Sequence, residues 1–319
     1  MRAKYDAIIV GSGAGGGVAA LLCARAGMSV LVLEAGPAKP FLDAALASTE
    51  DRKLSILAAA CIGGGSGLQW NADPHYLDED SARQWSKHSG GIDFFVELAE
   101  HYAALAPKPS YLAQAAERGA HLLADARVEN AHVDRSGRVH GVNVYFMVEG
   151  EPRRRTIAAR RVIVAAGALR TPGILAASGV RNAHLGKHLR LHPTVAVLAD
   201  GKPRALVSIC DRDEGWVCIW DVPRIAYQLS RGDAKQVRDA AQTLPSGKRT
   251  GVFSVHQMGT ARMHDDPALG VVDADGRVHG HPNIIVADAS VFPDASGVGP
   301  MQTVMALAHR AAGRLIANG

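Results

Sequence analysis

The pattern of apolar and polar residues near the start of the chain predicts a β-α-β unit. Residues 5–10 end in the apolar run Ala-Ile-Ile-Val, which predicts a buried strand. A glycine loop follows at 11–17, and the small-residue run over 18–26 predicts a helix that ends at Gly27. Residues 29–34 predict a second short buried strand. This order of elements is typical of a unit with parallel strands.

The same criteria predict a mixture of strands and helices further along the chain. Helical spacing recurs over 93–105, and residues 110–124 predict a helix with a glycine break followed by a strand. The β-rich runs 127–134 and 137–148 are joined by the turn Asp-Arg-Ser-Gly, and 159–166 predicts another buried strand. Three later segments follow from the same patterns: strands within 206–222, a helix over 234–244 and an amphipathic helix over 303–316.

Length and composition indicate a globular protein with one elaborate domain or two smaller ones. The chain has 319 residues and is 47% hydrophobic, which is enough to bury a large core. Its 35 basic and 31 acidic residues are interspersed, so the net charge of +4 forms no basic face and we expect no nucleic-acid partner. The densest basic run, at 153–155 and 160–161, flanks a Gly-Glu-Pro turn signal and is interpreted as a solvated hairpin.

The cysteine pattern and the absence of long apolar runs favour a cytoplasmic protein. Cys23, Cys61, Cys210 and Cys218 show no metal-like spacing with histidine, so we expect reduced thiols and no metal. The first strand starts by Tyr5, which leaves no room for a signal peptide. No apolar run approaches the ~20 residues needed to span a bilayer, and we therefore expect no transmembrane segment.

The glycine loop has the features of a dinucleotide-binding motif. Gly11, Gly13 and Gly16 form GxGxxG between a predicted strand and a predicted helix, and Glu34 ends the next predicted strand. Glycine permits a tight turn, close approach of a pyrophosphate and close packing of helix on strand, while the carboxylate binds ribose hydroxyls. Glu34 disfavours NADP, because a 2′-phosphate would be repelled there. The loop does not separate NAD from FAD, since both contain an adenosine diphosphate half.

Several separated motifs, taken in order, resemble the glucose-methanol-choline (GMC) family of FAD-dependent alcohol oxidoreductases. The N-terminal pieces are VGSGAGGGVAA and LEAG, and the middle of the chain contains ACIGGGSGLQWN, VIVAAGALRTPGILAASG and HLGKHLRLHP. The C-terminal pieces are HQMGTARM, VVDADGRVHGHPNIIVADASVFPDASGVGP and TVMALAHR. The triple glycine, SYLAQAAERGA and HQMGTARM resemble the branch that includes the long-chain fatty alcohol oxidases.

The resemblance implies an α/β fold, with a Rossmann-like FAD-binding domain and a reduced, β-containing substrate domain. It assigns residues 1–75, 108–196 and 256–319 to a discontinuous FAD-binding domain. Residues 76–107 and 197–255 are then the reduced substrate or cap region.

The resemblance also implies the roles of individual residues. His256 matches the family's active-site histidine, which takes the hydroxyl proton as hydride moves to flavin N5. Asp288 is expected near the ribityl chain and pyrophosphate, where it accepts hydrogen bonds from a sugar hydroxyl or a backbone amide, or else caps a turn. The full set of expected cofactor contacts is Gly11, Gly13, Gly16, Glu34, Gly63, Gly64, Gly65, Ser66, Val128, Ala166, Gly167, Asp288, Ala289, Pro300 and Met301.

The other histidines receive different interpretations. His192 belongs to a matched motif and is expected to shape the flavin domain. His264, His279 and His281 are expected at the surface or in turns. The alternative for His256 itself is a core histidine that caps the following Gly-Thr turn.

Three departures from the family pattern bear on activity. Gly299 stands where the family has Asn or His, whose side chain would be the second hydrogen-bonding partner of the alcohol oxygen. Gln69 stands where the related branch usually has Asn, and no histidine or cysteine follows for covalent attachment, so we expect FAD to be held non-covalently. The chain is also much shorter than is usual for the family, with the missing length expected within 71–109 and 193–256.

These observations lead to three functional hypotheses. The preferred one is FAD-dependent oxidation of a primary alcohol to an aldehyde, in which His256 is the base and oxygen or a quinone-like compound is the electron acceptor. The second is a flavin-binding scaffold with little or no catalysis, which Gly299 and the short cap region favour. The third is an NAD-dependent dehydrogenase, which the first loop permits and the C-terminal motifs disfavour.

Overall fold

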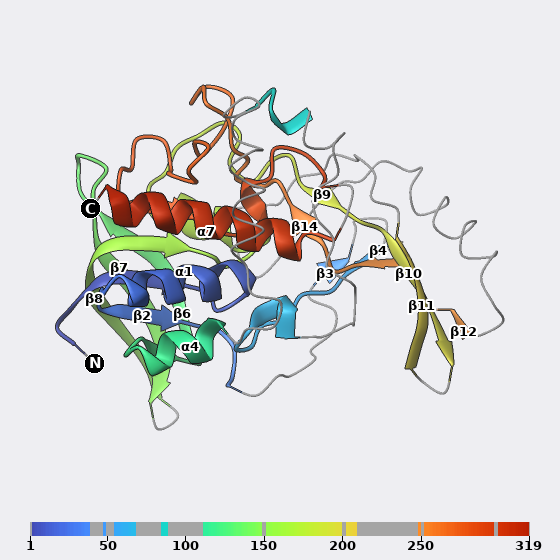
Figure 1. Ribbon diagram of the computed structural model, residues 1–319, viewed down its shortest axis with the longest axis horizontal. Helices are drawn as coiled ribbons and strands as arrows, with labels where there is room; N and C mark the ends of the chain where they lie inside the picture. Colours follow the sequence, from blue (N-terminus) through green and yellow to red (C-terminus); the bar gives the residue numbers. More distant parts are fainter. Residues whose placement is uncertain are drawn as a thin grey trace.

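A parallel sheet forms the centre of the fold (Figure 1). The computed structural model of the chain describes residues 2–38, 47–48, 54–67, 84–88, 111–148, 151–199, 202–208, 248–249, 252–296 and 299–318. The strands run in the order β5-β2-β1-β8, and β15 pairs with the other side of β8. Their bounds are Lys4–Val10 for β1, Val30–Leu33 for β2, His121–Leu123 for β5, Glu151–Val164 for β8 and Ile284–Val286 for β15.

The central strands are buried on both faces, which explains their continuous apolar runs. In β1, Ala7 and Ile9 pack into one core cluster, whereas Ile8 and Val10 pack into the other. The first face is covered by three helices, of which α1 and α7 lie side by side in Figure 1. Parallel strands covered on both faces show no polar alternation. The bounds of these helices are Ala14–Arg25 for α1, Tyr111–Glu117 for α4 and Met301–Ala317 for α7.

An antiparallel meander extends from the parallel sheet. Strands β6 (Ala126–Val133) and β7 (Val139–Val148) pair with each other, and β7 pairs with the first half of β8. The predicted hairpin at the basic run is confirmed, because Arg153 pairs with Phe146 and Arg155 with Val144, and both arginines are exposed. One strand, β8, therefore belongs to the exposed meander in its first half and to the buried parallel sheet in its second half.

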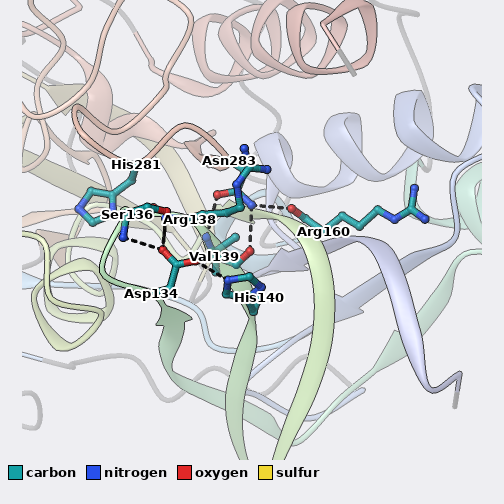
Figure 2. A network of polar contacts seen from close by, with 9 residues as sticks. Asp134, Ser136, Arg138, Val139, His140, Arg160, His281 and Asn283 are labelled. Carbon is teal, nitrogen blue, oxygen red and sulfur yellow. Dashed lines mark hydrogen bonds and ion pairs between the residues drawn. The ribbon is translucent and has the colours of Figure 1, made fainter.

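A polar network holds the turn between β6 and β7 (Figure 2). The carboxylate of Asp134 accepts hydrogen bonds from Ser136 N and Oγ, and His140 Nε2 lies 2.6 Å from its Oδ2. The bonds from Ser136, and then that from His140, hold the pKa of Asp134 well below its ordinary value. Asn283, just before β15, binds Val139 N and O through its amide group. The network therefore joins the loop before β15 to the meander.

A second, smaller sheet contains strands from distant parts of the chain. Its order is β11-β10-β13-β4-β3, and β12 also pairs with β10. Two of its strands, β3 and β4, lie within residues 1–75, which were expected to belong to the FAD-binding domain. The domain boundaries given above stay a prediction. The bounds are Ala47–Ser48 for β3, Leu54–Ile56 for β4, Thr194–Ala199 for β10, Lys202–Ser208 for β11, Lys248–Arg249 for β12 and Val252–Ser254 for β13.

Short elements complete the described part of the fold. A two-stranded ladder joins β9 (Arg190–Leu191) and β14 (Gln257–Met258), α5 spans Thr171–Ala177, and two 3-10 turns are η1 (Gly64–Gly67) and η2 (Ala289–Val291). The helices predicted over 93–105 and 234–244, and most of the strand region 206–222, lie outside the described residues. No helix within the described ranges is long and apolar enough to cross a membrane. The predicted fold class is confirmed: a Rossmann-like α/β unit with an additional, smaller β-sheet.

Candidate functional site

The sequence-predicted cofactor residues follow the carboxyl ends of neighbouring parallel strands. The first glycine loop follows β1, Glu34 follows β2, Gly167 lies three residues beyond β8, and Asp288 lies two residues beyond β15. Because these strands are parallel, their carboxyl ends meet at one edge of the sheet. Open parallel sheets bind ligands in the crevice at this edge.

The glycines of the first loop meet different surroundings. Gly11 has a φ of 99°, and a Cβ there would lie 2.3 Å from Ala165 O. A Cβ on Gly16 would lie 2.1 Å from Gly11 O, so both positions exclude any side chain. Gly13, by contrast, has no atom of the described residues within 4 Å of its Cβ position and precedes Ala14, the first residue of α1. The loop thus leaves open space at a helix N-terminus, where backbone N–H groups favour an anion.

The second glycine cluster lies against the first. Gly63 N donates to Ser12 Oγ at 3.0 Å, and a Cβ on Gly64 would lie 3.0 Å from Gly13 Cα. Gly65 has no neighbour within 4 Å of its Cβ position in the part of the chain that the structure describes. Ser66 lies in η1, but its side chain is outside the described part of the structure. The two clusters therefore form a cradle of backbone with open space beside it.

Glu34 is buried and is bonded to Ser12 of the first glycine loop, which in turn accepts a hydrogen bond from Gly63 of the second cluster. Its Oε2 accepts hydrogen bonds from Ser12 N at 3.0 Å and Ser12 Oγ at 2.6 Å, while its Oε1 accepts from Gly36 N at 3.0 Å. Its backbone oxygen accepts from Ala126 N, which brings the start of β6 and the nearby Val128 to the same end of the sheet. The role of Ser12 as the bridge was not predicted, although the residue lies inside the glycine motif.

Asp288 is buried and held by groups of the chain itself. Its Oδ2 accepts from Gly167 N at 2.9 Å and from Thr171 Oγ1 at 2.6 Å, and its Oδ1 accepts from Ser290 N at 2.8 Å. Burial raises the pKa of this carboxyl group, and the hydrogen bonds oppose that shift. Of the alternatives for Asp288, backbone amides and a turn cap are the ones observed, since Asp288 caps η2. Thr171 was not singled out from the sequence.

His256 lies between β13 and β14, next to the Asp288 loop. Gly259 N, three residues later, donates to Ala289 O at 3.0 Å. A Cβ on Gly299 would lie 3.7 Å from His256 Cε1, so Gly299 lies beside the histidine ring. Burial lowers the pKa of His256 to about 4, and the ring is therefore neutral at pH 7.

A buried histidine, His192, contacts the partly buried His256, and the sequence did not predict this contact. His192 Nδ1 lies 3.0 Å from His256 Nδ1, and the two rings meet edge-on with centroids 5.1 Å apart. Among the described residues, this is the hydrogen bond that the His256 ring makes. The ring is therefore not seen to cap the following Gly-Thr turn, which was the alternative interpretation of His256. The sequence placed His192 in the HLGKHLRLHP motif, as a residue expected to shape the flavin domain, and gave it no contact with His256.

The remaining predicted residues are placed as follows. Pro300 caps α7 and Met301 begins it with 42% of its surface exposed. Gln69, Gly297 and Val298 lie outside the described residues. The predicted turn histidines contact backbone oxygens or amides in loops: His264 with Asp266 N, His279 with His264 O and His281 with Gly137 O (Figure 2 for His281). Within the described residues, no cluster of His, Cys, Asp and Glu has the arrangement of a metal site.

Comparison with known families identifies the chain. Two models for GMC oxidoreductases match it, one over residues 106–194 and the other over 204–308, and together they cover more than half of its length. The chain belongs to the GMC oxidoreductase family. A further model, for NAD(P)-binding Rossmann-like domains, matches residues 9–66 of this family member.

Relatives of known sequence agree with that assignment. A long-chain-alcohol oxidase of Arabidopsis thaliana is 26% identical over an alignment of 274 positions, with 61% of this chain and 37% of the relative covered. The chain therefore spans about 37% of the length of that oxidase. An uncharacterised GMC-type oxidoreductase of Sinorhizobium fredii is 22% identical over an alignment of 480 positions, with 98% of this chain and 94% of the relative covered. The alignment has 480 positions, whereas this chain has only 319 residues, so much of the length difference between the two proteins lies in gaps within the alignment.

Solved structures share the fold. Pyridoxine 4-oxidase from Mesorbium loti superposes with a TM-score of 0.72 at 17% identity, over 97% of this chain and 98% of that chain. Formate oxidase from Aspergillus oryzae gives a TM-score of 0.71 at 14% identity, over 99% and 98% of the two chains. These likenesses establish the overall architecture of the GMC fold for this chain.

Proposed function

We propose that this GMC oxidoreductase binds FAD non-covalently and oxidises a primary alcohol to an aldehyde. One combination of features carries the proposal: the glycine cradle is open, and the neutral His256 lies in a segment that is hydrogen-bonded to Ala289 at the same edge of the sheet. The family assignment supports FAD as the cofactor, and the alcohol oxidases among the relatives support the substrate class.

The residues at the sheet edge fit the dinucleotide. The open positions at Gly13 and Gly65 leave room for a pyrophosphate beside the N-terminus of α1, which has no acidic residue in its first turn. Glu34 is an acceptor at the end of β2, where ribose hydroxyls bind in folds of this kind. Val128, Ala166, Met301 and the other predicted contacts would complete the binding surface.

FAD, when bound, supplies the acceptor for the hydride that leaves the carbinol carbon. His256 accepts the hydroxyl proton on the ring nitrogen that is free of His192, because the neutral ring has one unprotonated nitrogen. A positioned general base of this kind contributes ~10²–10⁴ in rate. Oxygen or a quinone-like compound would be the final acceptor of the two electrons.

The test compares the wild type with His256→Ala. The purified protein is expected to have visible flavin bands that bleach when a medium-chain primary alcohol is added without oxygen. The His256→Ala variant should keep the bands but lose the bleaching. Acid precipitation should release the flavin into the supernatant, since no covalent bond is expected. A His256→Ala variant that bleaches at the wild-type rate would refute the role of His256.

A flavin-binding scaffold with little catalysis is the second candidate, and Gly299 is the observation that favours it. The position beside His256 Cε1 carries no side chain that donates a hydrogen bond to the alcohol oxygen. The scaffold hypothesis predicts flavin bands that persist across a panel of alcohols in the wild type.

A further inference from the structure

His192, which is buried, and His256, which is partly buried, share one hydrogen bond whose proton belongs to one ring at a time. His192 follows β9 directly and is fully buried, with its backbone N bonded to Ser254 Oγ at 3.3 Å. Its Nδ1 lies 3.0 Å from His256 Nδ1. Because neutral imidazole has one donor nitrogen and one acceptor nitrogen, one Nδ1 must be protonated and the other not.

His192 remains a neutral partner over the working range of an enzyme. Burial, and then the neighbouring His256, lower the pKa of His192 to about 3. It therefore adds no positive charge beside His256 at neutral pH. Its Nε2 is buried and has no hydrogen-bond partner among the described residues. An unpaired buried polar atom is costly, which suggests that the ring is kept for another purpose than stability.

Proton acceptance by His256 requires one particular tautomer. Under the proposed function, on which this inference rests, Nε2 of His256 must be unprotonated to take the alcohol proton, so Nδ1 must carry the hydrogen. That hydrogen is donated to His192 Nδ1. When His256 becomes positively charged, the same hydrogen bond becomes charge-assisted and stronger.

We propose that His192 is the positioning residue that fixes the tautomer and the ring orientation of His256. Gly299 also lies beside the ring, with its Cβ position 3.7 Å from Cε1, but it has no side chain that could orient the histidine. The arrangement follows the logic of catalytic triads, in which a third group orients the base. In this chain the third group is a neutral histidine.

Two substitutions and one control separate this role from simple packing. His192→Asn keeps an amide oxygen close to the position of Nδ1, and His192→Phe keeps a ring of similar shape without an acceptor. Ser254→Ala is the control, because Ser254 bonds the backbone N of both histidines but neither ring. All proteins are studied with FAD bound, and their flavin absorption spectra are compared first.

The primary measurement is the tautomer of His256 from ¹⁵N NMR of histidine-labelled protein without alcohol. We expect the Nδ1–H form in the wild type, in His192→Asn and in Ser254→Ala, and a loss of that preference in His192→Phe. The rate of anaerobic flavin reduction by alcohol should fall about tenfold to a hundredfold in His192→Phe and recover in large part in His192→Asn.

Each result decides the matter. A wild type with His256 protonated on Nε2 overturns the proposal without any variant, and so does a His192→Phe variant with the wild-type tautomer and rate. A change of tautomer in Ser254→Ala equal to that in His192→Phe would also overturn it, because displacement of the backbone would then suffice. If the wild type fails to reduce flavin, but the His256 tautomer changes from wild type to His192→Phe as expected, the positioning role is supported and alcohol oxidation is refuted.

Discussion

Acidification is expected to destabilise the protein through the buried pair His192 and His256. Burial lowers the pKa of His256 to about 4 and that of His192 to about 3, whereas an unfolded histidine titrates near 6.5. Between these values the unfolded state binds more protons than the folded state. The free energy of unfolding therefore rises with pH in this window. The contribution of the two histidines to it is fully present above about pH 7 and is lost as the pH falls from about 6.5 towards 4.

The size of the effect follows from the two shifts. Lowering the pH from 7 to 5 protonates an unfolded histidine almost completely but leaves both buried rings neutral. Proton linkage then gives a loss of about 2 kcal/mol for each histidine, or about 4 kcal/mol for the pair. This is a large fraction of the 5–15 kcal/mol that is typical of a folded protein.

Urea unfolding of the FAD-free protein at pH 7 and pH 5 measures this loss. The His192→Phe variant is expected to lose about 2 kcal/mol less than the wild type over the same pH change, since only one buried histidine remains. Ser254→Ala is the matched control: it removes hydrogen bonds to both histidine backbones and should lower stability equally at the two pH values. If His192→Phe and the wild type show the same pH dependence, the buried pair does not titrate as the structure indicates.

Substitutions at four further positions test the cradle and the site. Replacing Gly299 with Asn is expected to speed alcohol-driven flavin reduction by up to ~10²-fold, because one preorganised hydrogen bond to developing charge is worth on the order of 3 kcal/mol. Gly299→Ala is the control, since it adds bulk without a donor. Equal rates of the two variants in stopped-flow measurements would argue against a missing donor. Gly15→Ala should prevent stable folding, because its Cβ would lie 1.8 Å from Ala287 O. Gly13→Ala should leave the melting temperature of the FAD-free protein unchanged, because the added methyl group meets no atom of the described residues. It should weaken FAD binding at least about tenfold in fluorescence titrations, because a bound pyrophosphate would meet that methyl group. Unchanged affinity would contradict the proposed pyrophosphate site. Glu34→Gln should lower the free energy of unfolding by about 1–3 kcal/mol, since its amide NH₂ would face backbone donors, and an unchanged urea midpoint would contradict this reasoning.

The first β-α-β unit was predictable because its strands are buried on both faces and its helix is rich in small apolar residues. The start of the helix was predicted too late, at residue 18, whereas α1 begins at Ala14. Glycine has low helix propensity, so the pattern placed Gly15 and Gly16 in a loop. The fold keeps these glycines in the helix because a Cβ on either would collide with a backbone oxygen.

The second sheet and the histidine pair were less accessible from the sequence. Strands such as β3 and β9 have two residues each, which is too short for any periodic pattern. His192 and His256 are 64 residues apart and meet because β9 pairs with β14. Motif resemblance identified His256, but the identity of its partner depends on a tertiary contact that neither spacing nor composition encodes.

The central claim is that FAD at the sheet edge and His256 together oxidise an alcohol. The most direct measurement is an anaerobic titration of the purified protein with a medium-chain primary alcohol, in which the loss of flavin absorbance and the aldehyde formed are both quantified. One aldehyde is expected for each flavin bleached. Flavin bands that persist at every alcohol concentration, with no aldehyde formed, would contradict the claim.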